Sequence, residues 1–239
     1  MYRLTMGRSA DASVRRCELD VLAHWYGDTE QLLDEAYGGY ADQTAFLAVE
    51  RDDGLVVGVS RVIIPGGRGL KTLADIGSPP WSVDAPRAVS AAGLDPDHTW
   101  DIATITVRRE LGAAGRVVAG ALYYGLINGT RVNDCSWIVA IIDRRARSLL
   151  SMVGLPLHAI PGTAPELYMG SPACAPVYAH MPTLVDMQRA SDPEAHRLIT
   201  LGHGLTDVLL PDDEGLALDT RDVVDLSAAE SSSSEVKNV

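Results

Sequence analysis

The segment from residue 99 to residue 129 most constrains the fold, because a strand, a turn and a helix follow one another there. TWDIATITV (99–107) alternates apolar and polar residues as a strand does, and residues 116–129 are mostly apolar, as in a buried helix. The turn between them, residues 108–115, carries two glycines. Either this turn holds an anionic group of a ligand on its backbone amides, or it only connects the strand to the helix.

Upstream, the pattern predicts one strand, two helices and a hairpin. The strand is expected at 1–6 and the first helix at 12–27. The second helix, 29–40, is expected to have Asp28 as its N-cap. Two strands within 44–66 flank Asp52-Asp53-Gly54, which is a strong hairpin signal.

Downstream, a long connection and five further elements are expected. Residues 65–99 are rich in Gly, Pro, Ser and Asp. A connection of this length is either a flexible loop on the substrate side or a solvated excursion with one short helix at 85–93. The remaining expected elements are a buried strand at 135–143, a helix at 143–155, strands at 157–162 and 176–181, and helical stretches within 184–204.

Composition limits the classes of function. The 239 residues are 46% hydrophobic and carry a formal charge of −12. Residues 211–239 are acidic and serine-rich, so we expect one domain at 1–210 followed by a disordered tail. The acidic body argues against broad nucleic-acid binding. No apolar run predicts a membrane span or a signal peptide.

The cysteines and histidines predict neither a disulfide framework nor a metal site. Three widely spaced cysteines are typical of free thiols in a reducing cytoplasm, which is the expected location. No two histidines lie at ligand spacing on one element, so no metal is expected. No nucleophile motif is present either, and direct attack by a substrate group is therefore favoured over a covalent intermediate.

The order of elements and the turn together resemble the GNAT-type acyltransferases. Arg109-Glu110-Leu111-Gly112-Ala113-Ala114 fits that group's signature of Gln or Arg, two residues, Gly, one residue, then Gly or Ala. The resemblance implies an α/β fold with a mixed, mainly antiparallel central sheet flanked by helices. It also implies a split between strands four and five that receives the donor.

A narrower resemblance covers about residues 10–180. The N-terminal half is similar to the acyl-homoserine-lactone synthases and the long-chain N-acyl amino acid synthases, on matches at Trp25, Glu35, Asp42, Arg61 and Asp75. The lactone synthases carry an arginine three residues after an acid on strand four, whereas here Asp101 is followed by Thr104. The resemblance therefore implies acyl transfer to an amine rather than lactone formation.

For the donor, the resemblance implies an acyl-CoA or an acyl carrier protein as cosubstrate and no permanently bound cofactor. The donor's arm would pair with the main chain of the fourth strand, and its phosphate would lie on the turn. Alternatively, the glycines merely close the turn and the arginines are solvated. The expected donor-binding residues are Thr106, Val107, Arg108, Arg109, Gly112, Ala113, Ala114, Gly115 and Arg116.

For catalysis, Asp101 is the preferred base for the amine, and Glu35 is a further candidate. Asp101 has the alternative interpretation of a solvated acid at a strand edge or of a partner in a helix cap. Tyr168 is the candidate acid for the departing thiolate, with Tyr123 and Tyr124 as alternatives. The expected acceptor-binding residues are Trp25, Asp42, Arg61 and Thr104.

Arg61 and a group of three arginines each have two interpretations. Arg61 binds the acceptor's carboxylate, or it pairs with an acid such as Glu35, Asp42 or Glu166. The three arginines at the start of the 143–155 helix bind an acidic carrier protein or a coenzyme A phosphate, or they are solvated; they are Arg144, Arg145 and Arg147. Two alternative functions remain open: an aminoacyl-tRNA-dependent transferase of this fold, and a catalytically silent binding or assembly domain.

Overall fold

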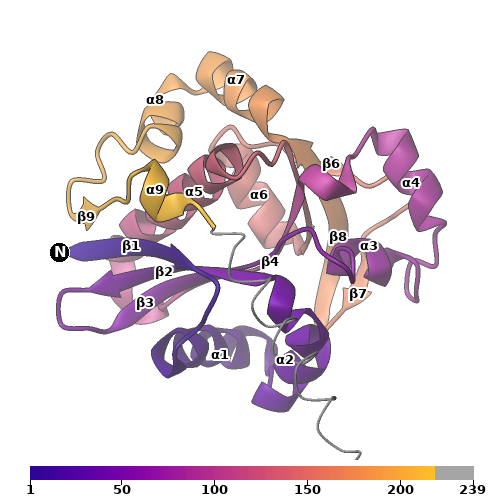
Figure 1. The fold of residues 1–239 in the computed structure, drawn as a ribbon, viewed down its shortest axis with the longest axis horizontal. Coiled ribbons are helices and arrows are strands. Elements are labelled where there is room, and N and C mark those ends of the chain that lie inside the picture. Colours follow the sequence, from indigo (N-terminus) through magenta and orange to yellow (C-terminus); the bar gives the residue numbers. More distant parts are fainter. Residues whose placement is uncertain (219–239) are drawn as a thin grey trace, which may run out of the picture.

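A computed structural model describes residues 1–218, which form a β-sheet with helices on both faces (Figure 1). The strand order is β6-β8-β5-β4-β3-β2-β1-β9, and β7 pairs with β8. The strands are β1 (Tyr2–Gly7), β2 (Thr44–Arg51), β3 (Val56–Ile63), β4 (Thr99–Val107), β5 (Trp137–Ile142), β6 (His158–Ala159), β7 (Glu166–Tyr168), β8 (Ser171–His180) and β9 (Val208–Leu209).

The helices connect these strands and cover the sheet. They are α1 (Ala12–Tyr26), α2 (Glu30–Tyr37), α3 (Lys71–Ile76), α4 (Ala85–Ala92), α5 (Gly115–Val132), α6 (Arg144–Met152), α7 (Met181–Ser191), α8 (Pro193–Ala195) and α9 (Asp213–Leu216). Short 3-10 turns occur at η1 (Gly38–Gln43), η2 (Pro96–His98) and η3 (Arg109–Ala114), and a π-helical turn, η4, at His196–Thr200.

The sheet is mainly antiparallel, as expected. The neighbouring pairs are antiparallel except β4 with β5 and β1 with β9, which run parallel. The β2–β3 hairpin turns at Asp52–Gly54, where Gly54 has a φ of 84°. The structure therefore confirms the mixed α/β sheet and the hairpin.

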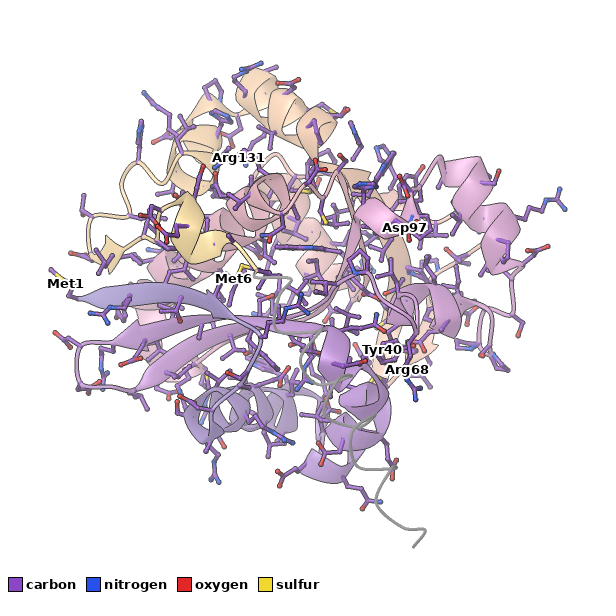
Figure 2. All side chains as sticks on the ribbon, viewed as in Figure 1. Met1, Met6, Tyr40, Arg68, Asp97 and Arg131 are labelled. Carbon is purple, nitrogen blue, oxygen red and sulfur yellow. The ribbon has the colours of Figure 1, made fainter. Side chains whose placement is uncertain are left out.

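Helices α1 and α5 lie on opposite faces of the sheet (Figure 1). On the first face, buried Val14 and Cys17 of α1 belong to one apolar cluster with residues of β2 and β3. On the other face α5 lies very close to β3, since a Cβ at Gly58 would be only 2.5 Å from Val118 Cγ1. Side chains pack on both sides of the strands (Figure 2), so the sheet is the centre of the core.

The 65–99 connection packs against the body through two short helices, while residues 66–69 and 77–80 are exposed. It contains α3, which the sequence pattern did not predict, and α4, which it did. Leu70, Ile76 and Ala88 are buried in an apolar cluster that also includes Val139 of β5. The connection is therefore part of the packed body.

Three further features differ from expectation. The N-cap of α2 is Thr29 rather than Asp28, because the Thr29 hydroxyl accepts from the N–H of Leu32. Strand β7 was not predicted. The packed body continues past residue 210, where the tail was expected to start, because Leu216 of α9 is fully buried and Asp213 pairs with Arg131 (labelled in Figure 2). The rest of the expected tail lies outside the described residues.

Candidate active site

The pairing of β4 with β5 ends after three residue pairs. Thr99 pairs with Trp137, Trp100 with Ile138 and Asp101 with Val139, while β4 continues to Val107 and β5 to Ile142. The two strands therefore part after Asp101, and this gap is the strand split, with Asp101 at its apex. On its other side β4 stays paired with β3 up to Val107.

The register of β4 determines which main-chain groups face the split. Arg108 N–H donates to the carbonyl of Val57 at 2.9 Å, and hydrogen-bonded and non-bonded pairs alternate along antiparallel strands. Thr106 therefore bonds with β3. The N–H and C=O groups of Ile105 and Val107 point away from β3, toward the side where β5 has separated.

The turn after β4 requires glycine at one position. Gly112 has φ 53° and ψ −120°, a conformation that residues with a Cβ rarely adopt. A Cβ placed there would meet no atom within 4 Å, so the surface over Gly112 is open. Ala113 and Arg116 are also exposed, whereas Ala114 and Gly115 are partly buried where α5 begins.

Two arginines beside this turn have protein partners. Arg108 Nε donates to the carbonyl of Val56 at 2.9 Å, and its terminal nitrogens lie 3.2 Å from Asp20 and 3.5 Å from Glu110. Its side chain is largely buried and links α1 to β3, so the geometry favours a structural role for Arg108. Arg109 is exposed and lies 3.4 Å from His24 of α1.

Asp101 anchors the start of α3. Its two carboxylate oxygens accept from the N–H of Thr72 at 2.5 Å and from the Thr72 hydroxyl at 2.8 Å. Only 1% of the residue is exposed, and this burial raises the pKa of Asp101 to about 6 although the Thr72 bonds lower it. Both oxygens are engaged, so the geometry favours an anchoring role over that of a proton acceptor.

Next to Thr72, three polar side chains form a network that we call the relay cluster: Lys71, Asp75 and Tyr168. Lys71 Nζ donates to Asp75 Oδ2 at 2.5 Å and to the Tyr168 hydroxyl at 2.8 Å. The Tyr168 hydroxyl donates to Asp75 Oδ2 at 2.5 Å. Burial and the bond to Asp75 raise the pKa of Tyr168 well above its ordinary value, which keeps the phenol protonated.

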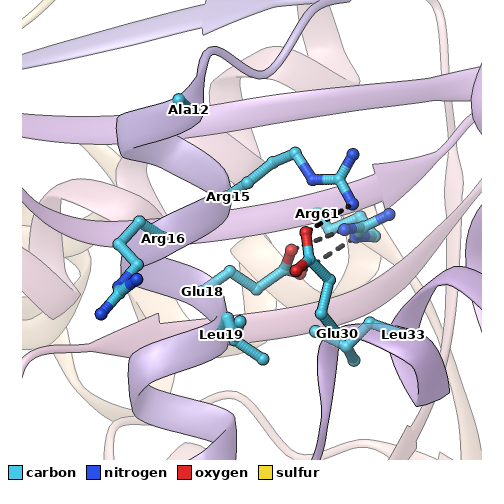
Figure 3. A pocket seen from close by; sticks show the side chains of 8 residues that line it. All are labelled: Ala12, Arg15, Arg16, Glu18, Leu19, Glu30, Leu33 and Arg61. Carbon is cyan, nitrogen blue, oxygen red and sulfur yellow. Dashed lines mark hydrogen bonds and ion pairs between the residues drawn. The ribbon is translucent and has the colours of Figure 1, made fainter.

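Arg61 pairs with Glu18, not with Glu35, Asp42 or Glu166. Its Nε and one terminal nitrogen lie 3.0 and 2.6 Å from the two oxygens of Glu18, and Glu18 also accepts from the Thr104 hydroxyl at 2.6 Å. The Arg61 guanidinium is 4.8 Å from the ring centre of buried Tyr37. The pair forms the inner end of a pocket of about 300 Å³ between α1 and α2 (Figure 3).

Other expected catalytic and acceptor residues lie outside this arrangement. Glu35 is exposed on α2 and accepts from Gln31 at 2.8 Å. The side chain of Asp42 is exposed too. Tyr123 and Tyr124 pack against the core from α5, on the opposite face from α1. The structure therefore brings Asp101, Tyr168, Arg61 and Thr104 into one region but does not bring Glu35 or Asp42 there.

The end of α1 closes one face of the split. The Tyr26 hydroxyl donates to Asp143, the residue after β5, at 2.9 Å, and Arg145 lies 5.0 Å from the ring centre of Trp25. Arg144 and Arg145 are exposed and Arg147 is partly buried. None of these three arginines has an ion pair with another residue of the described 1–218.

Four residues of this region were not singled out from the sequence: Glu18, Tyr37, Lys71 and Thr72. Glu18 and Lys71 are buried at 1% and 9% exposure, which is unusual for charged side chains unless they are paired. Glu18 does occupy the apolar face of α1, one residue after buried Cys17. An acidic residue on the apolar face of a helix was the sequence signal that could have identified Glu18. The sequence around Lys71 contains no comparable signal.

The strand order with a split between β4 and β5 is the fold of the GNAT-type acyltransferases, and the chain has that fold. Within residues 1–218, none of the helices combines the length and hydropathy that crossing a bilayer requires. The same residues contain no group of three His, Cys, Asp or Glu side chains placed to hold a metal ion.

One solved structure supports the assignment of the fold, and two further solved structures are similar to the chain. FeeM, an N-acyl amino acid synthase from uncultured soil microbes, superposes with a TM-score of 0.57 at 11% identity, over 78% of this chain and 96% of FeeM. The acyl-homoserine-lactone synthase LasI gives 0.49 at 14% identity, over 89% and 98%. A putative N-acetyltransferase from Lactobacillus plantarum gives 0.49 at 11%, over 75% and 98%. No protein-family model and no curated protein matches the chain.

Proposed function

We propose that the protein is an N-acyltransferase, which moves an acyl group from a thioester donor to the amine of a small metabolite, amino acid or peptide. The observation that carries the proposal is the strand split, in which the free edge of β4 leads from the turn at Gly112 to the apex at Asp101. The six residues of β4 beyond Asp101 span about 20 Å at about 3.3 Å per residue. An extended pantetheine arm has a comparable length.

The donor is proposed to lie along β4 as an additional strand would. Its amides would pair with the main-chain groups of Ile105 and Val107, and one N–H directed at the thioester oxygen would stabilise the oxyanion by about 3 kcal/mol. The donor's phosphate would lie on the open surface over Gly112. The first turn of α5 contains no acidic residue that would offset its positive dipole end, and Arg116 adds charge there.

The donor is acyl-CoA or an acyl carrier protein, and α6 supports contact with either. Arg144 and Arg145 begin α6 beside the split, and a coenzyme A phosphate or an acidic carrier surface would provide the negative charge that they lack. Leu149 and Met152 follow Arg145 on the same helix face and are 47% and 70% exposed. This mixed apolar and basic surface supports carrier contact.

The acceptor is proposed to approach from the α1–α2 side. The pocket in Figure 3 ends at the Arg61–Glu18 pair, and Thr104 of β4 contacts the same Glu18. Two nitrogens of Arg61 are engaged by Glu18, and the third has no hydrogen bond within the described residues. We therefore propose that Arg61 binds a carboxylate of the acceptor while it stays paired with Glu18.

Thiol release with a panel of donors and amines tests the proposed function. Acyl-CoA thioesters and acyl-carrier thioesters of several chain lengths are each offered with amino acids and small amines, and free thiol and N-acyl product are measured. Turnover with one donor class identifies the donor. Turnover that requires aminoacyl-tRNA would replace the proposal with an RNA-dependent transferase, and tight partner binding without thiol release would identify a silent domain.

The cytoplasm is the proposed location. All three cysteines, Cys17, Cys135 and Cys174, are buried and unpaired, which supports a reducing compartment. Burial raises the pKa of Cys17 and Cys135 to about 11, so neither thiol is activated as a nucleophile. This supports direct attack of the amine on the thioester.

A further inference from the structure

The relay cluster lies at the apex of the strand split. Thr72, whose N–H and hydroxyl are held by Asp101, directly follows Lys71 in α3. Tyr168 reaches the cluster from β7, which lies beside α3 (Figure 1). Asp101 is the last residue of β4 that pairs with β5, so an arm lying in the split ends next to these three side chains.

The hydrogen bonds of the relay cluster have a defined direction. A lysine ammonium only donates, so Lys71 occupies a lone pair of the Tyr168 oxygen and leaves the phenolic proton to Asp75. Asp75 Oδ2 accepts from both Lys71 and Tyr168. Asp75 Oδ1 has no hydrogen bond within residues 1–218, and the carboxylate is 24% exposed. Asp75 thus has one oxygen that faces the tyrosine and one that remains free.

Resting on the proposed function, we propose that Asp75 and Tyr168 carry the proton of the acceptor amine to the departing thiolate, and that Lys71 positions them. The amine nitrogen forms the bond to the thioester carbon, and its proton passes to Asp75 Oδ1. When the C–S bond breaks, Tyr168 gives its phenolic proton to the sulfur, and the Asp75 carboxyl group rotates so that its new proton passes to the phenolate oxygen. The relay ends in its starting protonation state, with one proton moved from nitrogen to sulfur.

The surroundings of the relay cluster favour this path. Tyr37 from α2 packs on the Lys71 ammonium, whose nitrogen is 5.4 Å from the Tyr37 ring centre. Trp81 packs on the Tyr168 ring at 5.2 Å between centres. The other charged groups facing the cluster are Asp101 of β4, with both oxygens engaged, and the Glu18–Arg61 pair beyond Tyr37. Asp101 and Glu18 thus have both carboxylate oxygens engaged, whereas Asp75 keeps one oxygen free to accept a proton.

Kinetics of Asp75→Asn, Tyr168→Phe, Lys71→Met and Lys71→Arg test the relay, with the acyl donor and amine that support turnover by the wild type. We expect Asp75→Asn and Tyr168→Phe to lower kcat roughly 100-fold with little change in the donor KM. We expect Lys71→Met to lower kcat with little change in the donor KM, because Asp75 and Tyr168 lose the ammonium that donates to both of them. Lys71→Arg keeps a cation that can donate to both groups, so it should restore most of kcat.

Asp186→Asn is the matched control, because Asp186 lies exposed on α7 in a pair with Arg189, outside the relay cluster. Wild-type kcat in Asp75→Asn, or a loss of kcat in Lys71→Met that Lys71→Arg does not restore, would overturn the relay while leaving acyl transfer in place. No thiol release by the wild type would overturn both. If Asp75→Asn does not fold, the kcat of Tyr168→Phe tests the relay instead, because this change removes one hydroxyl and keeps the ring against Trp81.

Discussion

At Gly112 the backbone has a conformation that other residues rarely adopt, and the surface above it is open. If the donor's phosphate lies there, Gly112→Ala should raise the donor KM about tenfold, because a methyl group and a shifted turn would displace the phosphate. This corresponds to a loss of roughly 1.4 kcal/mol of binding free energy. Steady-state kinetics with varied donor measure this effect.

Gly93→Ala is the control for backbone strain, since Gly93 has a φ of 67° and open space around its Cβ position but ends α4, outside the split. Both variants should lose about 1 kcal/mol of folding stability. An unchanged donor KM in folded Gly112→Ala would remove the phosphate from this turn.

The Glu18–Arg61 pair is buried at 1% and 11% side-chain exposure and joined by two hydrogen bonds. Glu18→Ala should therefore lower the free energy of unfolding by about 3 kcal/mol, because it leaves the Arg61 cation without its partner. Adding Arg61→Met to that variant should restore part of the loss. Urea unfolding of the two single variants and the double variant measures this coupling, and strictly additive losses would contradict it.

At the scale of elements, Asp101 joins α3 to β4 through its bonds with Thr72, and the burial of its carboxyl group makes stability depend on pH. The pKa of Asp101 is raised to about 6 from an ordinary value of 3.8, so the folded state favours the neutral carboxyl. Its contribution to stability is fully present below the ordinary pKa and is lost as the pH rises through about 6, by roughly 3 kcal/mol in all.

We therefore expect Asp101→Asn, which cannot ionise, to lack this loss. Unfolding free energies of both proteins at pH 4 and pH 7 give the comparison, and the wild type should lose more between the two. A difference between wild type and variant that is the same at both pH values would show that Asp101 does not ionise in this range.

The elements that the sequence predicted well are those with a long, regular pattern. The 44–66 hairpin, the strand at 99–107 and the helix at 116–129 each contain enough residues for apolar periodicity to be read. The six residues of α3 and the three of β7 are too few for that, and contacts with distant segments determine them instead. Because α3 and β7 carry Lys71 and Tyr168, the relay cluster could not be assembled from local patterns.

The sequence also did not predict which acidic residue pairs with Arg61. The acids expected as partners of Arg61 were Glu35, Asp42 and Glu166. Its partner in the structure is Glu18, which lies 43 residues away and was not among them. The nearer alternatives on α2 and η1, Glu35 and Asp42, are exposed. The angle at which α1 crosses β3 and β4 determines that Glu18 reaches Arg61. The packing of the whole sheet with its helices sets this angle, so local sequence patterns do not predict it.

At the scale of the molecule, the body extends past residue 210, because Leu216 is fully buried in the main apolar cluster. Leu216→Ala should lower the free energy of unfolding by about 3 kcal/mol through the cavity that it leaves. Leu209→Ala is the control, since Leu209 is 57% exposed and its truncation should cost under about 1 kcal/mol. Equal stabilities of the two variants would contradict the packing of α9.

The strand split is tied at both ends. Three residue pairs join β4 and β5 at the apex, and at the mouth the end of α1 touches Arg109 on one side and Asp143 on the other. The two edges are thus held apart before any ligand arrives. In the proposed mode of binding, a donor arm that enters would complete an interrupted sheet by β-augmentation, and little of the binding free energy would go into moving the backbone.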